Sequence, residues 1–348
     1  MKNILVTGGC GFIGSNFILY MLEKHKDIKI VNLDKLTYAG NPANLIEIED
    51  NDNYFFVRGD ICNEKVILDI FENHNVNTVV HFAAESHVDR SILGPEEFIR
   101  TNVFGTFCLL EVCRKFWKDV SDKKFLHVST DEVYGSLGET GLFTENTSYD
   151  PSSPYSASKA SSDHIVRSYN RTFGLPINIT NCSNNYGPYQ FPEKLIPLVI
   201  DRIIDKKEIP VYGKGDNVRD WLFVKDHCKA IETVLVNASD GETYNVGGNN
   251  EITNIDIVRT LCDLVDEFTK SNNSQNLIKF VKDRPGHDKR YAIDASKIKN
   301  ELDWSPEYNF KTGIRETVLW YINNRKWVEN IKTGDYLKYF EDQYNERL

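Results

Sequence analysis

The chain has 348 residues, which is long for a single hydrophobic core and predicts about two domains, or one large domain with an appended lobe. Hydrophobic residues make up 41% of the sequence and charged residues 26%, as in ordinary globular proteins, so extended disordered or fibrous segments are not expected. The 51 acidic residues outnumber the 41 basic ones, giving a formal charge of -10, and this excess argues against a protein that binds nucleic acid.

Other classes of protein are disfavoured by what the sequence lacks. No apolar run reaches the roughly 18 residues of a membrane-spanning helix, and glycines interrupt the N-terminal apolar run, so we expect neither a membrane segment nor a signal peptide. The seven cysteines are scattered and form no CxxC pair, which predicts reduced thiols in a cytoplasmic protein. The histidines show no HxxxH or HxxE spacing, so we expect no bound metal.

The first half of the chain alternates β-branched runs with helical patterns. We expect helices at residues 12–25, 65–74, 95–117 and 155–173, and strands at residues 4–7, 28–33, 54–58, 78–82, 125–129 and 177–181. Strands that alternate with helices of this length indicate βαβ units and a parallel sheet covered on both faces. The fold class predicted is therefore α/β, a Rossmann-like doubly wound parallel sheet.

The second half has a different composition. Residues 183–219 are rich in Pro, Gly, Asn and Tyr, and beyond them we expect a strand in DWLFV, helices near 224–236 and from Thr253, a strand around Tyr244 and an amphipathic segment at 295–302. We interpret residues 1–182, with return segments at about 220–246 and 308–325, as a dinucleotide-binding domain. The remainder of 183–348, mainly about 183–219 and 247–307, would form a smaller, partly interwoven substrate-binding lobe.

A glycine-rich loop follows the first expected strand. The run GGCGFIG contains both GxGxxG and GxxGxxG, the latter through Gly8, Gly11 and Gly14. Glycines there let a pyrophosphate approach the backbone at the positive end of the next helix. Asp34, just past the second strand, is placed to accept hydrogen bonds from a ribose, which favours NAD over NADP. Asp60, after the third strand, could hold an adenine amino group or simply cap its own loop.

Two further segments carry chemistry. The fifth strand ends in HVSTDEVYG, which puts Thr130, Asp131 and Glu132 at the carboxyl end of a buried strand, where open α/β sheets bind ligands. In PYSASKA, Tyr155 and Lys159 are four residues apart and share one face of a helix. A cation beside a phenol favours the phenolate, so we expect Lys159 to lower the pKa of Tyr155. Tyr155 could then remove a hydroxyl proton while a hydride leaves the same carbon.

These motifs resemble a known family. GxxGFIG and YxxxK are shared by the extended short-chain dehydrogenases/reductases, and the blocks DKLTYAGN, FAAESHVDRS, STDEVYG and NCSNNYGPYQFPEKLIPL resemble the dTDP-glucose 4,6-dehydratases. The resemblance continues through YGKGDNVRDWLFV and DRPGHDKRYAID to WYINN, nearly the whole chain. One departure is the loop SLGETG, which is shorter than in some relatives. The resemblance implies an NAD-dependent lyase that converts dTDP-glucose to dTDP-4-keto-6-deoxyglucose for rhamnose-type deoxysugar biosynthesis, and a homodimer.

The resemblance also implies a role for each catalytic side chain. Tyr155 would be the base for the sugar 4-hydroxyl, while Lys159 would set the pKa of Tyr155 and hold the nicotinamide ribose. Glu132 would take the proton from carbon 5, and Asp131 would protonate the departing 6-hydroxyl. Thr130 would orient the 4-hydroxyl. Because adjacent carboxyl groups in opposite protonation states need different environments, these last assignments depend on the fold.

The binding residues follow from the same resemblance. Besides Tyr155 and Lys159, it implies NAD contacts from Gly8, Gly11, Phe12, Ile13, Gly14, Asp34, Lys35, Leu36, Thr37, Asp60, Ile61, Phe82, Ala83, Ala84, Glu85, Ser86, Thr101 and Asn185. For the sugar nucleotide it implies Ser86, Thr130, Asn184, Lys194, Leu195, Pro210, Val211, Tyr212, Arg219, Asn254, Arg284 and His287. Among these, two arginines could hold a diphosphate bidentately, and a tyrosine could lie against the pyrimidine.

Two other functions remain open at this stage. An NAD-dependent nucleotide-sugar epimerase or decarboxylase would need only Tyr155 and Lys159, and would leave Asp131 and Glu132 idle. A catalytically silent dinucleotide sensor would be expected to have a broken YxxxK motif, whereas both of its residues are present. The Asp-Glu pair therefore favours the dehydratase.

Overall fold

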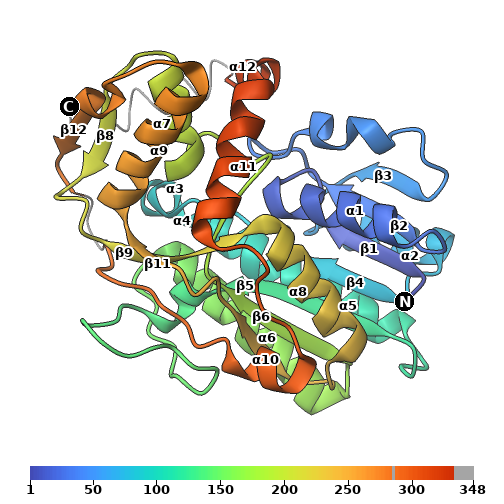
Figure 1. The fold of residues 1–348 in the computed structure, drawn as a ribbon. Helices are drawn as coiled ribbons and strands as arrows, with labels where there is room; N and C mark the ends of the chain where they lie inside the picture. Colours follow the sequence, from blue (N-terminus) through green and yellow to red (C-terminus); the bar gives the residue numbers. More distant parts are fainter. Residues whose placement is uncertain (284–286, 333–348) are drawn as a thin grey trace.

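The centre of the molecule is a seven-stranded parallel sheet, shown in a computed structural model that describes residues 1–283 and 287–332 (Figure 1). The strand order is β3-β2-β1-β4-β5-β6-β10. Their bounds are β1 Asn3–Thr7, β2 Lys29–Asp34, β3 Tyr54–Arg58, β4 Thr78–His81, β5 Lys124–Thr130, β6 Ile177–Cys182 and β10 Thr243–Val246. The order reverses between β1 and β4, which opens a crevice at the carboxyl ends of these strands.

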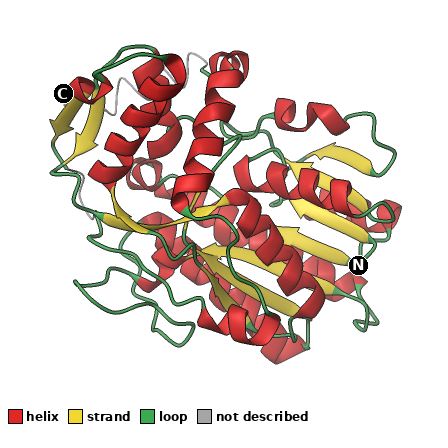
Figure 2. Cartoon of the chain, viewed as in Figure 1, coloured by secondary structure: helices red, strands yellow, loops and turns green. Residues whose placement is uncertain are grey.

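Helices cover both faces of this sheet, because consecutive apolar residues along the strands point to opposite sides (Figure 2). Ile4 and Val6 pack with α1 (Phe12–Lys24), α8 (Val224–Asn237) and α10 (Ser296–Leu302). Leu5 packs on the other face with α2 (Glu64–His74), α5 (Thr106–Phe116) and α6 (Pro154–Phe173). The α/β doubly wound fold is thus confirmed, and the six expected strands agree with the structure to within one residue at each end.

A second group of elements lies beyond the carboxyl ends of β5 and β6. It contains two small sheets, β11-β9-β7 and β12-β8, and its own apolar core around Ile200, Trp221 and Leu261. The bounds are β7 Asn184–Tyr186, β8 Ile209–Tyr212, β9 Val218–Phe223, β11 Glu251–Thr253, β12 Ile278–Val281, α7 Leu195–Ile204, α9 Asn254–Thr269, α11 Phe310–Asn323 and α12 Arg325–Ile331. We call this group the second lobe.

Short helices complete the connections. Three of them follow the carboxyl ends of strands: η1 (Pro42–Ile48) after β2, α3 (Val88–Leu93) after β4, and η3 (Asp131–Tyr134) directly after β5. A further turn, η4 (Ser274–Leu277), precedes β12.

The helix expected at 95–117 is divided in the structure. It consists of α4 (Pro95–Phe98), the π-helical η2 (Ile99–Gly105) and α5. The π turn holds buried Asn102, whose side chain accepts a hydrogen bond from the backbone N–H of Glu85 and donates one to the hydroxyl of Ser158. The turn thereby ties the segment after β4 to α6.

The segment 308–325 also differs from the expectation. The sequence places it in the dinucleotide-binding domain, but it forms α11, whose apolar side chains pack in the core of the second lobe. The physical reason is that α7 and α9 present apolar faces of their own, and α11 packs against both.

Candidate active site

The glycine-rich loop forms a tight cradle between β1 and α1. Gly8 has a φ of +71°, and a Cβ atom there would lie 2.7 Å from the backbone of Ala83. A Cβ atom on Gly14 would lie 2.4 Å from the carbonyl oxygen of Gly8. Gly11 precedes α1 and offers no side-chain cap to the first turn of the helix. A cradle free of side chains at a helix N-terminus fits a pyrophosphate group.

Two carboxylates stand at the ends of the next strands. Asp34 accepts hydrogen bonds from the backbone N–H groups of Cys10, at 2.9 Å, and Leu36, at 2.8 Å, while burial raises the pKa of its carboxyl group. Asp60 lies 2.9 Å from Nζ of Lys35 and accepts from the backbone of Cys62. Burial opposes ionisation of Asp60, but these hydrogen bonds outweigh it and lower the pKa. Both carboxylates are held in place before any ligand arrives.

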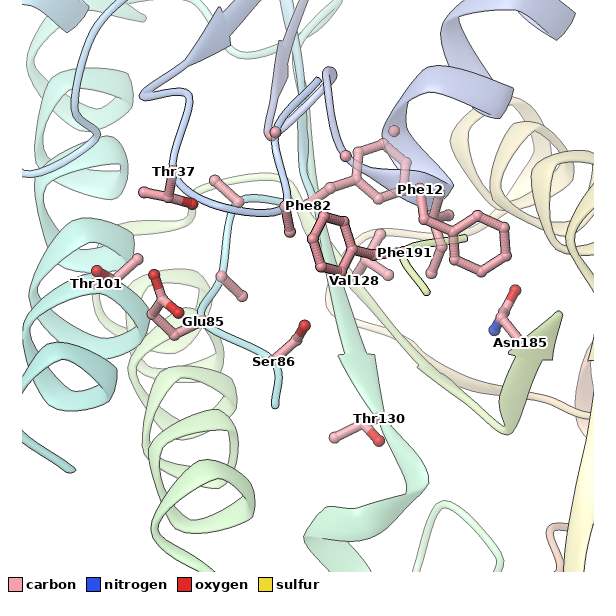
Figure 3. A pocket seen from close by; sticks show the side chains of 18 of the residues that line it. Phe12, Thr37, Phe82, Glu85, Ser86, Thr101, Val128, Thr130, Asn185 and Phe191 are labelled. Atoms are coloured by element: carbon pink, nitrogen blue, oxygen red, sulfur yellow. The ribbon is translucent and has the colours of Figure 1, made fainter. Parts of the chain in front are cut away.

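A cavity of about 310 Å³ joins these groups to the carboxyl end of β5. Figure 3 shows side chains from the first turn of α1, from the segment after β4, from β5 and from the second lobe lining the same space. The residues expected to bind a cofactor line this cavity, except Leu36, whose side chain packs against the hydrophobic core around α1. The five expected catalytic residues line it too: Thr130, Asp131, Glu132, Tyr155 and Lys159.

Asp131 and Glu132 have different surroundings although they are neighbours in the chain. Asp131 is 1% exposed, and its Oδ2 atom has no hydrogen-bond partner among the described residues. Burial raises the pKa of Asp131 well above its usual range, and the nearby charges of Glu132 and Asp220 raise it further. Glu132 is only partly buried, and its backbone N–H donates to the hydroxyl of Thr130 at 3.2 Å. Burial therefore favours the protonated form of Asp131.

Tyr155 and Lys159 share a face of α6, but their charges differ from the expectation. Burial, followed by the charge of Glu132, raises the pKa of Tyr155 well above its usual range. The ammonium group of Lys159 instead donates to the carbonyl oxygen of Val128, at 2.9 Å, and lies 3.4 Å from Nε2 of His127. Lys159 is thus directed to β5, and burial rather than the ammonium charge dominates the pKa of Tyr155 in this arrangement.

The residues expected to bind a sugar nucleotide fall into two groups. Ser86, Asn184 and Lys194 line the cavity together with Thr130, and Nζ of Lys194 donates to the carbonyl oxygen of Ser86 at 3.0 Å. The Oδ1 atom of Asn184 is buried and has no hydrogen-bond partner among the described residues. An acceptor of this kind is available to a ligand hydroxyl or amide.

The second group lies outside the lining of this cavity. The ring of Tyr212 is 6.1 Å from that of His287, and its hydroxyl donates to Asp89. Arg219 is buried against the ring of Tyr291. Its guanidinium group donates to the backbone carbonyl oxygens of Val218, in β9, and of Asp288.

The other members of this group have structural surroundings. Val211 is part of the core of the second lobe, and Pro210 is buried beside it. Leu195 and Asn254 begin α7 and α9. Arg284 lies outside the described residues.

Several cavity residues were not anticipated from the sequence. Those from the second lobe or its approach are Ser183, Gln190, Phe191 and Glu193, and those from the large sheet are Leu33, Ala39, Gly40, Gly59, Val128, Ser129 and Cys182. A signal for some of them was present in the sequence. Gln190, Phe191 and Glu193 belong to the block NCSNNYGPYQFPEKLIPL, which also contains the expected contacts of Asn184 and Lys194.

Neither a membrane-spanning helix nor a metal cluster is found in the part of the chain that the structure describes. No helix of residues 1–283 and 287–332 is long and apolar enough to cross a membrane. Within the same residues, no group of three or more His, Cys, Asp or Glu side chains could hold a metal ion.

Comparison with known proteins places the chain in a family. The family model described as GDP-mannose 4,6 dehydratase matches residues 5–317. The chain is 54% identical to dTDP-glucose 4,6-dehydratase 1 of Escherichia coli (strain K12), with 99% of both chains covered. The chain belongs to the dTDP-glucose 4,6-dehydratase family.

Solved structures of this dehydratase family share the fold. The dTDP-glucose 4,6-dehydratase of Bacillus anthracis str. Ames, in complex with NAD, is 49% identical and has a TM-score of 0.86, covering 95% of this chain and 100% of its own. DesIV of Streptomyces venezuelae, a dTDP-glucose 4,6-dehydratase solved with NAD bound, is 44% identical, with a TM-score of 0.88 and the same coverage. Membership of the family extends over both the large sheet and the second lobe.

Proposed function

We propose that this protein dehydrates dTDP-glucose to dTDP-4-keto-6-deoxyglucose, a step of deoxysugar biosynthesis. The observation that carries the proposal is the cavity itself, in which the buried Asp131, a partly exposed Glu132 and Tyr155 lie in one space with the glycine cradle. Membership of the dTDP-glucose 4,6-dehydratase family supports the choice of substrate.

The residues fit NAD as the cofactor. Gly8, Gly11 and Gly14 leave room for a pyrophosphate, and the positioned carboxylate of Asp34 would accept from the ribose hydroxyls and repel a 2′-phosphate. Structures of two members of the family were solved with NAD bound. When bound, NAD supplies the acceptor and later the donor of a hydride, together with a positive charge.

The side chains of this protein divide the proton transfers among them. In its phenolate form Tyr155 takes the proton of the 4-hydroxyl and becomes a phenol. Lys159, which lines the same cavity, is the cation that we assign to that phenolate, together with the positive charge that NAD would supply. A carbonyl group at carbon 4 acidifies the hydrogen on carbon 5, so the carboxylate of Glu132 can remove it. Asp131, whose burial favours the protonated form, gives its proton to the 6-hydroxyl, which leaves as water. Glu132 then returns its proton to carbon 5 as the hydride that NAD would hold returns to carbon 6. Thr130 orients the 4-hydroxyl.

Mass spectrometry of the sugar nucleotide tests this proposal. The purified protein is incubated with dTDP-glucose and a trace of NAD, and we expect a product lighter by one water with no net change in cofactor redox state. The Tyr155→Phe variant is the control, because it lacks the base for the first proton transfer. An unchanged mass with an altered sugar configuration would show an epimerase instead, and loss of carbon dioxide from a uronic acid substrate would show a decarboxylase.

The remaining expectations concern the setting of the enzyme. We propose that residues 1–182 with about 220–246 bind NAD and that the second lobe binds the sugar nucleotide, because Asn184 and Lys194 reach the cavity from that side. We also propose a homodimer in the cytoplasm. The seven free cysteines are consistent with a reducing compartment.

A further inference from the structure

Lys159 is held by side chains that take no direct part in the chemistry above. Its ammonium group, on a residue that is 4% exposed, lies 3.4 Å from Nε2 of His127. The same Nε2 atom lies 3.2 Å from Oδ1 of Asp163, which follows Lys159 by one turn of α6. The His127 and Asp163 side chains are fully buried. One ring nitrogen therefore stands between an ammonium group and a carboxylate.

The carboxylate of Asp163 is fixed from its other side. Its Oδ2 atom accepts hydrogen bonds from the hydroxyl of Ser129, at 3.0 Å, and from that of Tyr149, at 2.8 Å. The guanidinium group of Arg167 donates to the same Tyr149 oxygen at 2.7 Å. With Oδ2 engaged in this way, Oδ1 is left to face the ring of His127. These hydrogen bonds fix the orientation of the Asp163 carboxylate, because each one restricts the next side chain.

We propose that Asp163, through His127, is a positioning residue that keeps Lys159 charged and directed to the carboxyl end of β5. This inference rests on the role of Lys159 in the proposed function. A buried ammonium group with no carboxylate near it gives up its proton readily, because burial disfavours the charged form. Here a carboxylate one helical turn away supplies the compensating charge, and a neutral ring between the two sets their separation.

The groups that face Lys159 from the neighbouring elements are uncharged. From β5, His127 is neutral because burial lowers its pKa to about 4. From β4 and β6, His81 and the thiol of Cys182 are kept neutral by burial, which lowers the pKa of the first and raises that of the second. On α6 itself, Tyr155 is protonated at rest, because burial raises its pKa.

Asp163 is left as the charged partner on this side of Lys159. Its pKa stays low although it is buried, through the contact with His127 and through the charges of Lys159 and Arg167. Burial lowers the pKa of Lys159 to about 8, and the carboxylate of Asp163 opposes that effect. Removing this carboxylate should therefore leave burial unopposed.

The test is the titration of Lys159 itself, followed by NMR in protein labelled with 13C at lysine Cε. The Lys159 signal is assigned with Lys159→Arg, and the sample contains no sugar nucleotide. In Asp163→Asn, which keeps the shape of the side chain but not its charge, we expect the pKa of Lys159 to fall by about one unit or more, a tenfold change in its proton affinity. An unchanged titration in a folded Asp163→Asn protein overturns the proposal.

Two further variants separate charge from structure. Tyr149→Phe removes a hydrogen bond to the same carboxylate and keeps its charge, so we expect a much smaller shift of the Lys159 titration than in Asp163→Asn. Asp163→Glu restores the charge one methylene further out, and should return the titration toward the wild-type value. If Asp163→Asn does not fold, His127→Phe carries the test, because it removes the ring nitrogen that lies between Asp163 and Lys159. An unchanged Lys159 titration there overturns the proposal.

Activity provides the second measurement. With NAD and dTDP-glucose, kcat of Asp163→Asn should fall about tenfold at pH 8 and less at pH 6.5, so that the pH profile changes shape, with little change in KM. A uniform loss at all pH values would indicate a merely structural role and would overturn the proposal. The NMR titration needs no sugar nucleotide, so failure of the proposed function would appear only in the mass-spectrometric experiment.

Discussion

Asp131 and Glu132 are consecutive residues to which we assign opposite tasks. Asp131 points into a buried space at the end of β5, where no described side chain pairs with its Oδ2 atom, whereas Glu132 keeps contact with solvent. Two carboxyl groups in different surroundings can hold different protonation states at one pH, which is what an acid and a base in one elimination require. Adjacent residues achieve this here because η3 begins directly after the strand and changes the direction of the chain.

Replacing Glu132 should stop the reaction after the first oxidation. In Glu132→Gln the amide cannot take the proton from carbon 5, so we expect dehydration to fall by at least about 100-fold. The 4-keto sugar that still carries its 6-hydroxyl should accumulate on the enzyme and be found by mass spectrometry of a quenched single turnover. The control is Glu139→Gln, at an exposed position in the loop after η3, which should have wild-type activity. Turnover of Glu132→Gln at the wild-type rate would show that another group is the base.

The carboxyl group of Asp131 should lower the free energy of unfolding at neutral pH, and this effect can be measured. Its pKa is raised in the folded protein from a reference value of 3.8, so as the pH rises the unfolded chain loses this proton first. The contribution is absent below about pH 3.8 and grows unfavourable as the pH rises toward the folded pKa. The free energy of unfolding of Asp131→Asn, relative to wild type, should therefore increase between about pH 4.5 and pH 7.5, measured by urea unfolding, while dehydration is lost.

Asp122→Asn is the matched control for that experiment. Asp122 is exposed, and a hydrogen bond from Lys123 lowers its pKa in the folded protein. Its carboxylate stabilises the fold above the unfolded pKa of about 3.8, and the effect is lost only as the pH falls below that value. Relative to wild type, the free energy of unfolding of this variant should therefore stay nearly constant between about pH 4.5 and pH 7.5. Equal pH dependence in the two variants would contradict the assignment of Asp131 as a buried acid.

Among the elements, the junction between β1 and α1 determines where an anion can bind. The loop returns on itself, with the backbone N–H of Gly11 donating to the carbonyl oxygen of Gly8 at 3.1 Å. Gly14 lies against this turn, so the first turn of α1 can approach the strand only without a Cβ atom there. The glycine spacing is thus a packing requirement of the helix as well as an opening for a pyrophosphate.

Gly14→Ala tests this packing requirement. The added Cβ atom would lie 2.4 Å from the carbonyl oxygen of Gly8 and 2.8 Å from Cα of Gly9, both backbone atoms that cannot move alone. We expect a loss of about 2 kcal/mol of unfolding free energy and at least about tenfold weaker NAD binding, measured by urea unfolding and by calorimetry. Gly138→Ala is the control, because a Cβ atom there meets nothing within 4 Å. Unchanged NAD affinity in Gly14→Ala would argue against this cradle as the binding site.

Across the molecule as a whole, a partly buried ionic contact joins the large sheet to the second lobe. Arg90 of α3 lies over the ring of Tyr38, with 3.8 Å from Cζ to the ring centroid, and its Nε atom is 3.4 Å from Oε2 of Glu193. Glu193 is 3% exposed at its side chain, just before α7, and lines the cavity. Burial raises the pKa of Glu193, while the charges of Lys194 and Arg90 oppose this effect.

Removing Arg90 should weaken the contact between the large sheet and the second lobe. In Arg90→Met the buried carboxyl group of Glu193 loses a charged partner, and we expect a loss on the order of 2 kcal/mol in unfolding free energy. The double variant Arg90→Met/Glu193→Gln should recover part of that loss, since no buried charge remains there. Lys279→Met, which breaks an exposed ion pair with Glu208, should cost less than about 1 kcal/mol. Additive effects in the double variant would mean that Arg90 and Glu193 do not interact.

Features that depend on local pattern could be predicted from the chain alone. The strands, the glycine turn, Asp34 and the order of Tyr155 and Lys159 on one helical face follow from periodicity and spacing, because each needs only neighbours close in the chain. The longer sequence blocks indicate the family in the same way, because each block is contiguous in the chain.

The charge states and surroundings of the site residues, by contrast, are decided only by the tertiary structure. The burial of Asp131, the direction of Lys159 toward β5 and the contact of His127 with Asp163 depend on strands and helices that are distant in sequence. The same holds for α11, which packs with α7 and α9 in the second lobe. Desolvation and packing are properties of the assembled molecule, and no spacing in the chain specifies which groups are taken out of water together.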